Sequence, residues 1–198
     1  METLITLLPL LMFVLLGLLL FTGYPVAFGL AGKWLADGIN PYRMGGRGIL
    51  VGVAAFSAVI FAAPLASSSL FFAGALLIGF GGGLFAVATL HAAMTMPTGG
   101  LAGRGLALGA WGAAQATAQG LSTAIGGGLR DLVNTLGEVG LLTGPLTAPT
   151  TGYSVVYHLE IGLLFLTLAA LGPLVRVHRN ATTKTEGEAK LGLAEFPT

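Results

Sequence analysis

The chain has 198 residues, of which 55% are hydrophobic and 9% are charged, whereas about 25% of the residues in soluble domains are charged. The mean hydropathy of +0.88 is that of an integral membrane protein. The net charge of +1 argues against a nucleic-acid partner, and the absence of Cys excludes disulfides, thiolate chemistry and Cys-ligated metal centres.

Apolar stretches of membrane-spanning length recur along the sequence. A bilayer core of ~30 Å needs about 20 apolar residues in a helix, and lipid offers no hydrogen-bond partner to the backbone, so such stretches become helical. We predict five transmembrane helices, at residues 3–31, 48–63, 69–96, 103–129 and 153–175. The intervening segments are a basic loop at 32–47, a turn at 64–68, a Pro/Gly stop at 97–100 and a longer loop at 130–152.

The predicted fold class is therefore all-α, a polytopic membrane protein with about five transmembrane helices. Residues 1–175 form the transmembrane domain, and residues 176–198 form a polar cytoplasmic tail that we expect to be disordered. Cytoplasmic loops carry an excess of Lys and Arg. In a five-helix chain the basic residues fall mainly on one side, which predicts an outside N-terminus and a cytoplasmic C-terminus: Lys33, Arg43, Arg47, Arg104, Arg176, Arg179 and Lys184.

Small residues recur every four positions in two of the predicted helices. The fourth helix has the longer stripe, and the third has a glycine pair: Gly112, Ala116, Gly120, Ala124 and Gly128, then Gly79 and Gly83. Such stripes let helix backbones approach closely in lipid, and we predict that the longer one packs against another helix of this chain. The alternative is that the glycines make room for a flat ligand such as a porphyrin ring.

Polar residues inside predicted helices form the candidate sites. One helix face carries three polar residues spaced four apart, Trp111, Gln115 and Gln119. They either form hydrogen bonds between helices or line a cavity. Glu160 is the one carboxylate well inside a predicted helix, with Tyr157 and His158 beside it. Its carboxylate either makes a structural ion pair or hydrogen bond, or it belongs to a coupling or ligand site.

His91 is the histidine nearest the small residues of the third predicted helix. A neutral imidazole can ligate the magnesium of a chlorophyll-type ring, and a hydrogen-bonded structural role is the alternative. The sequence contains no nucleophile–base motif and no His, Asp and Glu cluster with metal-site spacing, so we expect neither an enzyme nor a metal site.

Four stretches carry a resemblance to a known family: GLAGKWLADGINPYR, GALLIGFGGGLFAVATL, GLALGAWGAAQATAQG and YSVVYHLEIGLLFLTLAALGPLVR. Residues 29–175 resemble the C-terminal half of the PucC-like, bacteriochlorophyll-delivery branch of the major facilitator superfamily. The resemblance implies that the five helices are similar to the last five of a twelve-helix transporter fold. It also implies a bacterial inner membrane, cytoplasmic or intracytoplasmic, as the location.

The function implied by the resemblance is assembly of photosynthetic light-harvesting complexes, by handling bacteriochlorophyll or antenna polypeptides. His91, Trp111, Gln115 and Gln119 are then the candidate pigment site, with His91 as the axial ligand. Bacteriochlorophyll is the one cofactor expected, and the expected partners are membrane lipid, antenna polypeptides or a missing N-terminal half. The alternatives are a truncated or split fragment of a secondary solute transporter that needs its missing half, and a non-functional remnant.

Overall fold

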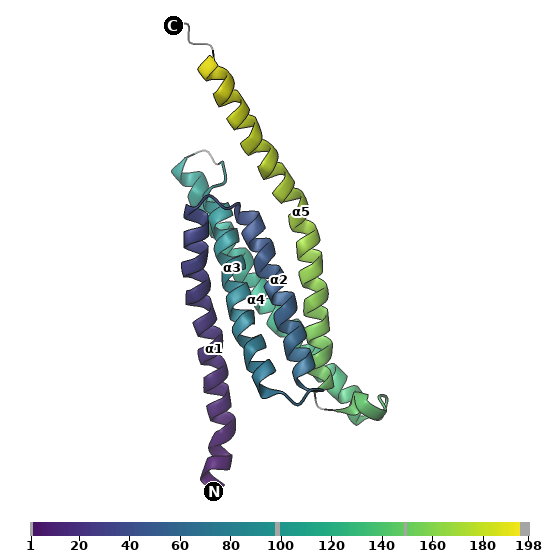
Figure 1. The fold of residues 1–198 in the computed structure, drawn as a ribbon. Helices are drawn as coiled ribbons and strands as arrows, with labels where there is room; N and C mark the ends of the chain where they lie inside the picture. Colours follow the sequence, from purple (N-terminus) through teal and green to yellow (C-terminus); the bar gives the residue numbers. More distant parts are fainter. Residues whose placement is uncertain (1, 98–99, 149, 195–198) are drawn as a thin grey trace.

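The computed structural model of the protein describes residues 2–97, 100–148 and 150–194. The described residues form five long α-helices, together with one short 3-10 helix (Figure 1). They are α1 (Glu2–Ala36), α2 (Pro41–Ala62), α3 (Ser68–Met94), α4 (Leu101–Glu138), η1 (Gly144–Thr147) and α5 (Thr151–Ala194). The predicted all-α fold class is confirmed.

Four helices stand side by side in the spatial order α1, α3, α2, α5, because α3 packs against both α1 and α2, and α2 also packs against α5. Helix α4 lies behind this layer in Figure 1 and runs the length of the bundle. It contacts α3 and α5. The turns before α2 and α4 lie at one end of the bundle, and the turns before α3 and α5 lie at the other (Figure 1).

Helix α2 begins seven residues before the predicted residue 48, so the predicted loop at 32–47 is wrong over most of its length. The reason is a helix start signal in Asn40 and Pro41. The Oδ1 of Asn40 accepts hydrogen bonds from the backbone N–H groups of Tyr42 and Arg43 at 2.9 and 3.4 Å. Pro41 occupies the first turn, where its missing N–H leaves no helical bond unmade. The basic residues that we assigned to a loop belong largely to α2.

The later helices also run past their predicted ends. Helix α4 continues to Glu138 and includes the first nine residues of the predicted loop at 130–152. These nine residues contain no Pro, and the first Pro of the predicted loop is Pro145. Helix α5 continues to Ala194 rather than ending near residue 175, and its last part is rich in Ala, Lys and Glu, which favour helix. We expected a disordered tail, whereas the described backbone of 176–194 is helical. The division into two domains stays a prediction.

Four helical segments of the described chain are long and apolar enough to cross a membrane: Pro9–Ala36, Pro41–Ala62, Ser68–Met94 and Thr151–Val175. Helix α4 is not among them, although it is 38 residues long. Its middle part, residues 105–129, carries no charge, and its lower hydropathy follows from Gln115, Gln119 and many glycines. Five helices are thus present, four of them are apolar enough to span a bilayer, and the membrane orientation stays a prediction.

The core lies among α1, α2 and α3 and consists mainly of small residues. One buried cluster contains Ala27, Ala31, Met44, Leu84 and Ala88. Met44 and Leu84 are the largest fully buried side chains among the described residues. The packing therefore depends on close backbone contact rather than on interlocking large side chains.

Glycines bring these helix backbones together. A Cβ atom placed on Gly48 would lie 2.8 Å from the carbonyl oxygen of Gly81, and a Cβ atom on Gly81 would lie 2.8 Å from the carbonyl oxygen of Gly48. Across the α1–α3 contact, Gly79 abuts the backbone of Leu20, and a Cβ atom on Gly83 would lie 2.7 Å from Cβ of Ala27. The glycine pair in α3 thus lies at the close contact with α1.

The longer stripe behaves differently, and our prediction that it packs against another helix of this chain is wrong for the described residues. A Cβ atom on Gly112, Gly120 or Gly128 would have no atom within 4 Å to meet, and Ala116 and Ala124 are exposed. No residue of α4 is buried. The physical reason is that α4 touches α3 and α5 through other residues, which include Trp111 and Gly126.

Candidate functional site

A wide, open cavity lies at the end of the bundle where α2 turns into α3 and α5 begins. Its volume is about 1310 Å³. Its walls come from the N-terminal half of α1, the α2–α3 turn, the segment before α5, and the first two turns of α5. The apolar and aromatic lining residues include Met12, Leu16, Val59, Ile60, Phe71 and Phe72, and the polar ones include Ser67, Ser154, Tyr153, Tyr157 and His158.

His158 is an exposed side chain in the cavity wall, on the second turn of α5. Its Nδ1 lies 2.7 Å from the backbone carbonyl oxygen of Ser154, one turn earlier. Because a carbonyl oxygen only accepts hydrogen bonds, the proton of the neutral ring sits on Nδ1 and the lone pair sits on Nε2. No second hydrogen bond involves this imidazole within the part of the chain that the structure describes.

Two tyrosines of α5 form the rest of the polar wall. The rings of Tyr153 and Tyr157 stack with their centroids 6.5 Å apart, and Tyr157 also packs against Phe56 of α2 at 5.8 Å. Both tyrosines line the cavity. These aromatic contacts fix the first turns of α5 against α2, so the cavity wall has a defined shape.

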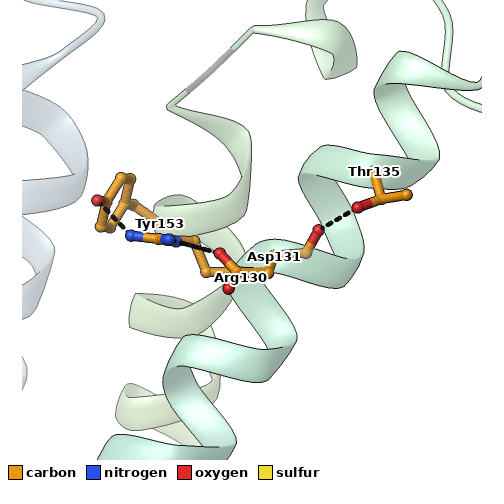
Figure 2. A network of polar contacts seen from close by, with 4 residues as sticks. All are labelled: Arg130, Asp131, Thr135 and Tyr153. Atoms are coloured by element: carbon orange, nitrogen blue, oxygen red, sulfur yellow. Dashed lines mark hydrogen bonds and ion pairs between the residues drawn. The ribbon is translucent and has the colours of Figure 1, made fainter.

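Arg130 ties the end of α4 to the start of α5 beside this wall (Figure 2). Its Nη1 donates to the hydroxyl oxygen of Tyr153 at 2.9 Å, and its Nε donates to Oδ1 of Asp131 at 2.8 Å. The hydrogen bond that Arg130 donates to Asp131, and then the one it donates to Tyr153, raise the pKa of Arg130 above its ordinary value. The group is exposed, so its role is to orient Tyr153 rather than to supply much stability.

Gly152 makes the α4–α5 contact possible. A Cβ atom at this position would lie 2.6 Å from Oδ1 of Asn134 and 2.8 Å from the carbonyl oxygen of Arg130. Only a residue without a side chain lets the start of α5 come this close to α4. Sequence analysis missed this glycine because it falls outside any four-residue repeat.

The residues predicted to bind pigment do not gather around a described cavity. Trp111 does connect α4 to α3, since its Nε1 donates to Oγ1 of Thr89 at 3.1 Å. His91 lies two residues further along α3 and is half-buried, whereas Gln115 and Gln119 are exposed. Both described pockets are lined by other residues. The tryptophan thus fits the interhelical hydrogen-bonding alternative, and a pigment site at these four residues stays a prediction.

Glu160 is half-buried in α5, and no hydrogen bond or ion pair of its carboxylate occurs among the described residues. Arg130, the basic residue on the same predicted side, is engaged by Asp131 and Tyr153 instead. The structural ion pair that we considered for Glu160 is therefore absent from the described part of the chain. Of the three polar residues singled out in this helix, Tyr157 and His158 line the cavity and Glu160 does not.

Comparison with known proteins finds similar proteins in several bacteria. A protein from Rhodobacter capsulatus described as an uncharacterized protein in the puhA-bchM intergenic region is 52% identical over 177 residues, which cover 89% of this chain and 36% of that protein. PucC of Cereibacter sphaeroides is 41% identical over 153 residues, covering 75% of this chain and 32% of its own length. PucC of Rhodovulum sulfidophilum is 46% identical over 111 residues, covering 56% and 24%.

The chain thus spans about a third or less of the length of these curated relatives. No solved structure matches it. The family model described as PUCC protein matches residues 14–179, which include α2, α3 and α4 entirely and most of the apolar part of α1 and α5. On this match, and on the identity with the relatives, the chain belongs to the PUCC protein family.

Proposed function

We propose that the protein is an accessory membrane protein for the assembly of photosynthetic light-harvesting complexes, and that it handles bacteriochlorophyll or antenna polypeptides. Membership of the PUCC family and the apolar helices support this reading. We further propose that it lies in the bacterial inner membrane with the N-terminus outside. The end of the bundle that holds Lys33, Arg43, Arg47 and Arg104 then faces the cytoplasm.

The observation that carries the proposal is the cavity of about 1310 Å³ at the start of α5. Pockets for small ligands usually occupy about 300–1,000 Å³ and combine apolar walls with a few polar groups. This one is larger and follows the same pattern, with aliphatic and phenylalanine walls and a polar strip on α5. A bulky, mainly apolar ligand with a few polar groups suits such a space, and a bacteriochlorophyll has that character.

The proposal is tested by deleting the gene in its photosynthetic host. We expect the deletion to lower the near-infrared antenna absorption of the membranes, while the bacteriochlorophyll extracted from whole cells falls less. The wild-type gene should restore the antenna bands. Unchanged antenna absorption in the deletion strain would show that the proposed function is wrong.

A pair of variants tests whether the cavity carries the function. Ala63→Trp places a large ring in the cavity wall, whereas Ala54→Trp places the same ring on an exposed position of α2 outside the wall. We expect Ala54→Trp to complement the deletion and Ala63→Trp to complement it poorly at equal protein level. Equal complementation by both variants would remove the cavity from the proposal.

The second candidate function is a fragment of a secondary solute transporter that works with a missing half. Two observations favour it: the chain spans about a third of its relatives, and the Gly112–Gly128 stripe of α4 has no partner among the described residues. This candidate predicts that the chain forms a stable complex with the unmatched part of a PucC relative when both are expressed in a heterologous membrane. Separate elution of the two polypeptides in mild detergent would count against it.

A further inference from the structure

We propose that His158 is an axial ligand in the large cavity, and that its Nε2 binds the central metal ion of a magnesium-containing tetrapyrrole. This inference rests on the proposed function for the class of ligand. It moves the site from His91, the residue favoured by the sequence, to the start of α5. The observations behind it are the hydrogen bond of the imidazole, its place in the cavity lining and the aromatic residues that share this lining.

The imidazole already has the arrangement found in metal-binding histidines. Such residues almost always donate the ring N–H that is not bound to metal to a carboxylate, a carbonyl or a water, which fixes the tautomer and orients the ring. The Nδ1 of His158 does this with the carbonyl oxygen of Ser154 at 2.7 Å. The Nε2 lone pair is therefore available, and the side chain lines the cavity.

His91 offers a weaker arrangement. No hydrogen bond of its ring occurs among the described residues, because only its backbone carbonyl is engaged, which accepts from the hydroxyl and the backbone N–H of Thr95. It also lines neither described pocket. A hydrogen-bonded ring in the lining of the cavity distinguishes His158 from His91.

The cavity fits a large ring with an apolar periphery. Tyr157 is next to His158 in α5 and Tyr153 lies five residues before it, while Phe71 and Phe72 of α3 and Met12 of α1 supply apolar surface. Aromatic side chains offer large apolar faces, and the tyrosines add hydroxyl groups that can reach carbonyl oxygens on a ligand. A metal-centred macrocycle can use all three features, whereas a purely aliphatic lipid chain leaves Nε2 without a bond.

The test compares binding of purified full-length protein to bacteriochlorophyll a and to bacteriopheophytin a, the same macrocycle without magnesium. The wild-type protein should prefer the metallated ring, and His158→Leu should reduce that preference by about tenfold or more, which corresponds to about 1.4 kcal/mol. His91→Leu is the matched control and should keep the wild-type preference. Resonance Raman markers of magnesium coordination give an independent readout of the ligand.

The outcomes separate the two proposals. Equal metal preference of the wild-type protein and His158→Leu, or loss of the preference in His91→Leu only, would overturn the assignment of His158. The proposed function would survive either result if the deletion strain still lacks antenna absorption. If His158→Leu does not fold, as judged by its helical circular dichroism, Ala63→Trp provides the second test, because it should weaken binding of both macrocycles without touching the imidazole. Undiminished binding of both macrocycles to Ala63→Trp would overturn the cavity as the site.

Discussion

The contact between α2 and α3 at Gly48 and Gly81 gives the most direct test of how this bundle is held together. In Gly81→Ala the new Cβ would lie 2.8 Å from the carbonyl oxygen of Gly48, whereas ordinary contacts begin at 3.4 Å. The atoms that it meets belong to the backbone and to a β-branched side chain, Val51, so α2 and α3 must separate locally. Overpacking of this kind costs about 1–3 kcal/mol.

The same substitution also raises helix propensity, and this contribution must be removed before the steric cost can be read. Replacing Gly by Ala in a helix interior gains about 0.8–1 kcal/mol. Gly120→Ala is the matched control, because Gly120 also lies in a helix interior and its Cβ would meet nothing within 4 Å. We expect Gly81→Ala to be less stable than Gly120→Ala by about 1–3 kcal/mol.

The assay is reversible unfolding of the purified full chain in mixed micelles with increasing sodium dodecyl sulfate, followed by circular dichroism. The free energy of unfolding is compared between the two variants, each against the wild-type protein. Equal stability of Gly81→Ala and Gly120→Ala would refute the close α2–α3 contact. Gly120→Leu extends the control, because its larger side chain should meet no steric barrier and should leave the isolated chain no less stable than the wild-type protein.

Three further predictions concern helix ends and orientation. Asn40→Ala should lower the free energy of unfolding by about 1 kcal/mol, because two backbone N–H groups at the start of α2 lose their acceptor; an unchanged unfolding midpoint would contradict the cap. Gly152→Val should destabilise the α4–α5 contact more than Tyr153→Phe, since its side chain meets Asn134 and the backbone of Arg130; proteolysis of the 139–150 segment measures this, and equal cleavage in both variants would argue against it. Topology reporters placed after residue 175 and within residues 140–149 should report opposite sides of the membrane, and the same side for both would exclude the predicted orientation.

The all-α class could be predicted because apolar length is a direct requirement of the bilayer, although α4 is less apolar than the four helices that could span it. Helix boundaries were harder to predict, since Lys33, Arg43 and Arg47 indicated a loop where the cap at Asn40 starts α2. That cap was readable in the sequence as Asn followed by Pro. The extension of α4 past residue 129 was hidden for a similar reason, because Arg130 and Asp131 resemble loop residues but can pair on a helix surface.

Partners of helix faces could not be predicted from the spacing of small residues. Gly79 and Gly83 share their four-residue spacing with the Gly112–Gly128 stripe, yet the first pair lies against α1, whereas a Cβ atom on a glycine of the stripe would meet no atom within 4 Å. Spacing defines a face but not what lies opposite to it. The cavity was equally hidden, because its walls come from segments far apart in the sequence. The spacing of four between Ser154 and His158 was the one local signal that could have drawn attention to it.

The small-residue core has a consequence for how this molecule tolerates amino-acid change. In most soluble domains the sensitive positions hold the bulkiest side chains, and truncation is the damaging event. Here the backbones of α1, α2 and α3 meet at Gly23, Gly48, Gly79 and Gly81, while long leucines and phenylalanines of α1 point outward. In saturation mutagenesis of this protein, enlargement of the smallest residues should therefore abolish expression. Truncation of the largest exposed residues should leave expression almost unchanged.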